Sequence, residues 1–145
     1  MITLNELLKG IESSRSILDE AVSVLGNINQ NNVSVQEVNA IIDRIDSGLS
    51  DVSKVIKLMS EATNALPRYL SWVNGPCNML KQSLGNASID IQEIHEFTTK
   101  KSGKDRITIS EKIKLNVKAN NSIIRLKSEL TNSRFILNQM YQKLQ

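Results

Sequence analysis

Apolar residues recur at intervals of three and four through most of the chain, the spacing that places them on one face of an α-helix. The pattern is clearest between residues 34 and 66. Ser34 and Glu37 form a capping-box sequence at its start, and Pro67 follows its end. We predict a helix over 34–66 whose core line comprises Val38, Ile41, Ile45, Gly48, Val52, Val55, Met59, Ala62 and Leu66.

Two further segments with helical spacing lie at the ends of the chain. Residues 3–26 begin with the capping pair Thr3 and Glu6, and Gly26-Asn27 supplies a stop. In residues 109–144, the apolar positions counted backwards from the C-terminus recur at helical spacing and so share one face. We predict one long helix in each segment.

The start of the last helix has an alternative. Residues 106–110 and 113–119 both alternate between apolar and polar positions, as the two strands of a hairpin would. Glu111-Lys112 is poor turn chemistry, however, and an isolated hairpin is marginally stable. Thr108 with Glu111 also makes a capping pair. We therefore favour a single helix from about residue 109.

The segment between the second and last helices contains several helix breakers. Asn74-Gly75-Pro76 is a turn sequence, and Gly85-Asn86 resembles a helix stop. Pro76 would suit the first position of a helix. We predict a broken third arm made of two short helices, residues 76–84 and 89–99.

These segments predict an all-α fold, an antiparallel up-down bundle of three long helices and a broken third arm, in a single domain over residues 1–145. The stretch 68–80 holds the only tryptophan and the only cysteine, and we interpret it as the corner that closes one end of the bundle. Ser14, Gly48 and Ser133 are small residues at core positions, which indicates either a close approach of helices or a cavity, and we favour close approach.

Composition points to a protein of a reducing compartment. The single cysteine excludes an internal disulfide and any multi-cysteine metal site. The first residues, MITLNELLKG, lack the basic and apolar regions of a secretory signal, and no stretch is long and apolar enough to span a membrane. We expect a soluble, cytoplasmic protein, with export by a dedicated machinery left open.

Few residues could support catalysis. Cys77 and His95 could form a nucleophile–base pair only if the two short third-arm helices folded face to face. Asp43 and Asp46 are one helical turn apart, as solvated surface acids usually are. The sequence has neither the Glu-x-x-His motif of bundle di-metal sites nor a phosphate-binding glycine loop. We predict no enzymatic activity, no cofactor, no metal and no small-molecule substrate.

Charge is distributed unevenly along the chain. Residues 1–96 carry seven Lys/Arg against twelve Asp/Glu, a net −5, and residues 97–145 carry eleven against three, a net +8. The basic third either pairs with the acidic helices of the same bundle or meets an acidic partner. The candidates for binding phosphate or anionic lipid are Lys100, Lys101, Lys104, Arg106, Lys112, Lys114 and Lys118.

By elimination, we expect a non-enzymatic protein-interaction module: an adaptor, a chaperone, an immunity-type inhibitor or a structural subunit. The partner would be another protein or a second copy of this chain. One alternative is a membrane-active bundle recruited to anionic lipid by the basic segment 99–118, and a second is non-specific binding of nucleic acid. Aromatic and Met side chains are typical of interface hot spots, so the candidate anchors are Tyr69, Trp72 and Met79.

Overall fold

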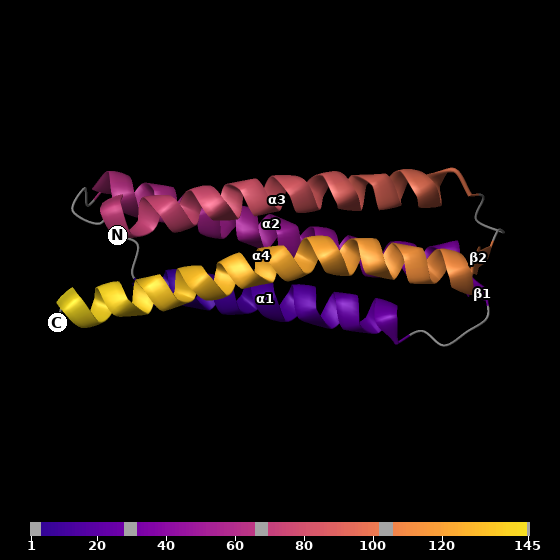
Figure 1. Ribbon diagram of the computed structural model, residues 1–145, viewed down its shortest axis with the longest axis horizontal. Coiled ribbons are helices and arrows are strands. Elements are labelled where there is room, and N and C mark those ends of the chain that lie inside the picture. The colour runs from indigo at the N-terminus through magenta and orange to yellow at the C-terminus, as the bar shows by residue number, and fades with distance from the viewer. Residues whose placement is uncertain (1–3, 28–31, 66–69, 102–105, 145) are drawn as a thin grey trace.

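The computed structural model of the protein describes residues 4–27, 32–65, 70–101 and 106–144 (Figure 1). The elements, in chain order, are α1 (Leu4–Gly26), β1 (Asn32–Ser34), α2 (Val35–Ala65), α3 (Leu70–Thr99), β2 (Arg106–Thr108) and α4 (Ile109–Leu144). The predicted all-α bundle is confirmed. The ends of α1, α2 and α4 fall within one residue of the predicted ends.

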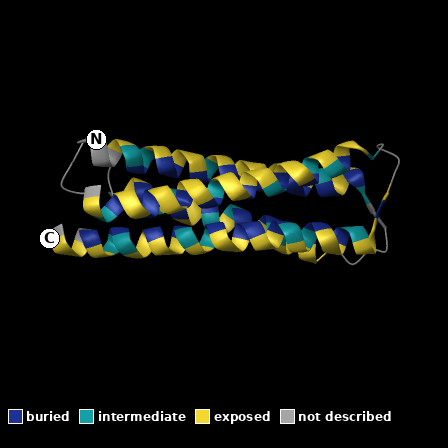
Figure 2. Cartoon of the chain, turned by 45° about the horizontal axis from the view of Figure 1, so that its top comes forward, coloured by how far each residue is buried: buried dark blue, intermediate teal, exposed yellow. Residues whose placement is uncertain are grey.

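The four helices pack side by side with up-and-down connections (Figure 1). Helix α1 packs against α2 and α4, and α3 packs against the same two helices, so each helix has two neighbours around the bundle. The start of α1 and the end of α4 lie at the same end of the bundle. Buried residues lie along the helix faces that meet in the core, whereas the residues on the outer faces are mostly exposed (Figure 2).

A short antiparallel strand pair closes the opposite end of the bundle (Figure 1). Strand β1 precedes α2 and β2 precedes α4, with Val33 opposite Ile107. The Ile107 side chain is completely buried. The hairpin alternative for residues 106–119 is therefore wrong, because β2 pairs with β1 and residues 113–119 are helical.

The capping sequences at the starts of α2 and α4 form the expected hydrogen bonds. At α2, the backbone N–H of Glu37 donates to Ser34 Oγ over 3.1 Å. At α4 the bonds are reciprocal: the N–H of Glu111 donates to Thr108 Oγ1 over 3.2 Å, and the N–H of Thr108 donates to Glu111 Oε1 over 3.1 Å. The Thr3 cap predicted for α1 lies outside the described residues.

The predicted break in the third arm is wrong, because α3 is one helix of 30 residues that includes Pro76 and Gly85. Pro76 lies in the second turn, where its missing N–H removes one intrahelical hydrogen bond. The buried face continues with helical spacing across both sites, through Val73, Cys77, Leu80, Ala87, Ile91 and Ile94. Burying this continuous face against α2 and α4 outweighs the local cost of the proline and the glycine.

The small residue Gly48 marks a close approach between α1 and α2. A β-carbon at Gly48 would lie 2.6 Å from Leu18 Cδ2, well inside normal contact distance. Gly10 is a second such point, because a β-carbon there would lie 2.9 Å from Val55 Cγ2. Close approach, as predicted, therefore explains Gly48. Ser14 and Ser133 are completely buried.

Candidate functional site

Helix α4 carries apolar side chains on two faces. Its inner face is part of the core and includes Leu115, Ala119, Ile123, Leu126, Leu130 and Leu137, each less than one-tenth exposed. Its outer face carries a second line of large apolar side chains: Ile109 (43% exposed), Ile113 (53%), Val117 (50%), Ile124 (56%) and Phe135 (59%). We call these five residues the outer stripe.

The five residues of the outer stripe share one side of α4, with exposed polar residues between Val117 and Ile124 and between Ile124 and Phe135. At about 100° per residue, its five positions fall within an arc of roughly 80°, centred about 130° away from the inner face. Among the described residues eight large hydrophobic side chains are exposed, and five of them belong to this stripe. A solvent-facing helix surface is normally polar, so the stripe is a candidate binding surface.

The amino-acid sequence already contained the signal for this surface. The alternation over residues 113–119 places Leu115 and Ala119 on the inner face of α4 and leaves Ile113 and Val117 outside. The same alternation led to the hairpin alternative. Plotting 109–144 as a helix would have separated the two apolar faces, and Ile124 and Phe135 would have extended the outer one.

Ion pairs with α1 cover one flank of the outer stripe. Lys127 pairs with Asp19, and Arg134 pairs with Glu12. All four side chains are at least partly exposed, and both pairs match one antiparallel register of the two helices. The positive charge on this flank is therefore balanced within the chain.

Contacts with α3 lie beyond the other flank. Lys118 pairs with Glu93, and Ser122 Oγ donates to Asp90 Oδ2. The hydrogen bond to Glu93 raises the pKa of Lys118, and the attraction of the Glu93 and Asp90 charges adds to this, against partial desolvation. Much of the basic charge of α4 is thus paired with acidic residues of the same bundle.

The predicted basic cluster is divided by the fold. Lys101 is half-buried against Glu111, 2.9 Å from Nζ to Oε2, and its Nζ lies 5.2 Å from the centre of the Phe97 ring. Lys112 is buried, and Lys118 is paired with Glu93. Lys104 lies outside the described residues. The exposed members of the cluster are Lys100, Arg106 and Lys114.

Of the predicted anchors, Trp72 and Met79 lie in the first three turns of α3. Trp72 is half-buried in the first turn of α3 and packs against the core, with Lys143 Nζ 4.9 Å from its ring centre. Met79 is 45% exposed on the same helix. Tyr69 lies outside the described residues. Residues 70–80 of the expected corner are helical, and Trp72 links the start of α3 to the end of α4 rather than standing free.

The cysteine and the histidine do not come together. Cys77 and His95 lie on one continuous helix, 18 positions apart, which corresponds to about 27 Å at 1.5 Å per residue. Cys77 is buried and its Sγ contacts Ser60 Oγ at 3.6 Å and the Ile56 carbonyl at 3.8 Å. The geometry considered for a nucleophile–base pair is therefore absent for these two residues.

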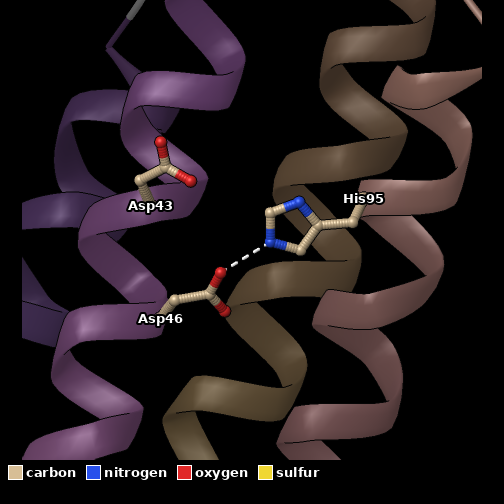
Figure 3. Close-up of side chains that lie close together, drawn as sticks. All are labelled: Asp43, Asp46 and His95. Carbon is tan, nitrogen blue, oxygen red and sulfur yellow. Dashed lines mark hydrogen bonds and ion pairs between the residues drawn. The ribbon is translucent and has the colours of Figure 1, made fainter.

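The fold instead brings His95 to two carboxylates that the sequence did not group with it. Asp43 and Asp46 point from α2 toward His95 on α3 (Figure 3). His95 Nε2 and Asp46 Oδ2 are 2.6 Å apart, joined by a hydrogen bond. One ligand-type atom from each residue lies within 4.8 Å of the other two. Only the antiparallel register of α2 and α3 creates this cluster, so sequence spacing alone could not reveal it.

The cluster of Asp43, Asp46 and His95 contains ligand types that zinc accepts. Within it, however, His95 and Asp46 are arranged as a hydrogen-bonded pair. Zinc–ligand distances of about 2.1 Å in a tetrahedral site place two ligands roughly 3.4 Å apart. His95 Nε2 and Asp46 Oδ2 are closer than that, at 2.6 Å. Both carboxylates are exposed, and the histidine is partly buried. In this geometry the cluster links α2 to α3.

Comparison with protein-family models, with curated proteins and with solved structures gave no match to this chain. By its fold, the chain is an up-and-down four-helix bundle, and it carries an apolar stripe on the outside of its last helix. None of the described helices has an apolar stretch of the length that a membrane crossing needs.

Proposed function

We propose that this protein is a non-enzymatic protein-interaction module and that the outer stripe of α4 is its binding surface. The observation that carries the proposal is a line of five large apolar side chains, 43–59% exposed, on a helix whose inner face already belongs to the core. Covering that line with a partner removes apolar surface from water, worth about 25 cal/mol per Å². Exposed apolar patches of this kind mark interaction sites.

The charges around the stripe favour a protein partner over anionic lipid or nucleic acid. Binding to phosphate backbones or lipid headgroups relies on several Lys/Arg side chains that are free to contact phosphate. Lys118, Lys127 and Arg134 each have a carboxylate partner in the same chain. Besides the ion-paired Arg134, the exposed bases beside the stripe are Lys114 and Arg125, so apolar contact dominates.

In-cell photo-crosslinking tests the proposal. A photoreactive amino acid at Ile124, in the middle of the stripe, should form covalent adducts with protein. The matched control is the same amino acid at Ser50, which is exposed on α2. Adducts with lipid or nucleic acid alone, or equal protein adducts from both positions, would contradict the proposal.

A further inference from the structure

We propose that the occupant of the outer stripe is a second copy of this chain, bound through α4 in an antiparallel pair whose two-fold axis passes beside Ile124. This inference rests on the proposed function, because it names the partner of the same surface. A two-fold dimer requires a surface that is complementary to itself. The spacing of Ile113, Ile124 and Phe135 within the outer stripe meets that requirement.

Three of the five stripe residues, Ile113, Ile124 and Phe135, are arranged symmetrically about Ile124, whereas the positions that mirror Val117 and Ile109 are Thr131 and Gln139. Ile113 precedes Ile124 by 11 residues and Phe135 follows it by 11. Val117 precedes it by seven residues, and Thr131 follows it by seven. In an antiparallel pair centred on Ile124, Ile113 of one copy therefore lies beside Phe135 of the other. Val117 lies beside Thr131, and the two Ile124 side chains meet.

The same positions are also symmetric around the helix axis. At about 100° per residue, the four flanking positions lie roughly 20° around the helix axis from the direction of Ile124, two on each side. These positions are Ile113, Val117, Thr131 and Phe135. Ile113 and Phe135 deviate in opposite directions, as do Val117 and Thr131. Side chains on the two copies would therefore alternate across the contact, which is how antiparallel helices interlock.

The polar positions within the stripe fit the same pairing. Asn120 and Ser128 lie four residues on either side of Ile124, and both are exposed. They would meet between the apolar layers, where an amide and a hydroxyl can hydrogen-bond to each other. The Thr131 hydroxyl already donates to the Lys127 carbonyl over 3.0 Å, so its methyl group is the part available to a partner.

The flanking charges predict a weak dimer that salt strengthens. Lys114 and Arg125 lie on the same flank of the stripe, and a two-fold axis places both copies of each on the same side of the dimer. Their mutual repulsion is screened by salt.

Ile113 and Phe135 are about 33 Å apart along the helix, so one seam of this length buries less than the roughly 1,600 Å² of a standard interface. We expect micromolar rather than nanomolar affinity.

Sedimentation equilibrium of the full chain provides the first test. With rising protein concentration, the weight-average mass should approach twice the 16.2 kDa of the monomer, and added NaCl should shift the curve to lower concentration. The Ile124→Glu variant should remain monomeric with an unchanged Tm, because Ile124 is more than half exposed. The Ser50→Glu variant is the control and should dimerise like the wild type.

Crosslinking between engineered cysteines tests the orientation. In a Cys77→Ser background, the Ile124→Cys variant should be joined to itself by a short bis-maleimide. A mixture of the Ile113→Cys and Phe135→Cys variants should give more dimer than either variant alone. Dimers formed equally well by each single variant would indicate parallel pairing and overturn the inference. Circular dichroism of each variant checks that the fold is retained.

The two proposals fail in different ways. A wild-type protein that stays monomeric at every concentration overturns the dimer, as does an Ile124→Glu variant that still associates. If the photoreactive residue at Ile124 then crosslinks to a different protein, the proposed function stands. If it crosslinks to no protein, both proposals fail. Self-association that weakens with salt would rest on opposite charges and not on the apolar stripe, so it also overturns the dimer proposed here.

Discussion

Gly48 on α2 lies directly against Leu18 on α1, so that a β-carbon at Gly48 would lie 2.6 Å from Leu18 Cδ2 and 2.8 Å from Leu18 Cγ. Leu18 is completely buried, and close-packed interiors leave such a side chain little room to move. Overpacking of this kind costs about 1–3 kcal/mol, and the better helix propensity of alanine recovers up to about 1 kcal/mol. We expect Gly48→Ala to lower the free energy of unfolding in urea by about 1–2 kcal/mol.

Gly85→Ala is the matched control. Gly85 is also inside a helix, but a β-carbon there would meet no atom within 4 Å. The propensity gain should then act alone and stabilise the protein by about 0.5–1 kcal/mol. Opposite signs for the two variants would support the close approach of α1 and α2. Equal effects would contradict it.

The hydrogen bond between His95 and Asp46 should contribute to the docking of α3 on α2. His95→Ala removes the Nε2–Oδ2 contact of 2.6 Å and leaves Asp46 beside Asp43. We expect a loss of about 1 kcal/mol in the free energy of unfolding, as for one hydrogen bond with a solvated alternative. Thermal or urea unfolding, followed by circular dichroism, measures it.

Asp43→Asn separates the hydrogen bond from the cluster as a whole. Asp43 belongs to the same cluster, yet the hydrogen bond of His95 is to Asp46. Removing the Asp43 charge should leave stability unchanged or slightly higher, since two carboxylates lie close together. A loss as large as that of His95→Ala would show that Asp43 is a partner of His95 as well.

The cap of α4 should make stability depend on pH in the acid range. The hydrogen bond from Lys101, followed by that from the Thr108 backbone, lowers the pKa of Glu111 below its ordinary value of 4.5. Ionised Glu111 therefore favours the folded state above pH 4.5, and this contribution is lost as the pH falls through the lowered value. Glu111→Gln should consequently be less stable than the wild type at pH 7, with the difference shrinking as the pH falls below 4.5.

Lys101→Met provides the second arm of this experiment. Glutamine at position 111 still allows a capping hydrogen bond. The pH-dependent part of the stability difference between Glu111→Gln and the wild type therefore reports the charge of Glu111 alone. If Lys101 is the main cause of the lowered pKa, Glu111→Gln in the Lys101→Met background should produce a much smaller pH-dependent difference. A difference of unchanged size would assign the effect to the helix N-terminus instead.

Trp72 offers a spectroscopic probe of the other end of the bundle, because it is the only tryptophan. Lys143 Nζ lies 4.9 Å from its ring centre, and the ring packs against the core. Lys143→Gln should cost about 0.5–1 kcal/mol. It should also make the fluorescence more accessible to acrylamide. Trp72→Ala should cost more, about 2–3 kcal/mol, since it also removes buried apolar surface.

Lys143→Arg should behave as the wild type in both measurements, because arginine keeps the cation over the ring. Lys81→Gln removes an exposed charge from α3 away from this contact and controls for net charge. Quenching that is unchanged in Lys143→Gln would mean that Lys143 does not cover the ring in solution.

The helix ends were predictable because their causes are local. Ser34 and Thr108 are caps whose partners lie three residues away, and buried positions recur at helical spacing along α1, α2 and α4. The third arm was mispredicted for the converse reason. Pro76 and Gly85 oppose the helix locally, whereas the packing that overrides them comes from α2 and α4.

The candidate surfaces were predictable to different degrees. The outer stripe follows from the positions of Ile113, Val117 and Ile124 on one helix, so a helical projection of the sequence would have found it. The pairing of His95 with Asp46 depends on the register of two antiparallel helices. The pairing of β1 with β2 joins segments that are far apart in the chain. Neither leaves a local pattern in the sequence.

The strand pair has a consequence for how two chains could exchange parts. The bundle consists of two helical hairpins, α1–α2 and α3–α4, and β1 and β2 lie at the turn ends of these hairpins. In a domain-swapped dimer, each chain would lend one hairpin to the other, and an element that holds its own two hairpins together opposes that exchange. The buried Ile107 and the β1–β2 hydrogen bonds would all have to be given up before a hairpin could leave. The strand pair thus adds to the free energy that such an exchange of hairpins would cost.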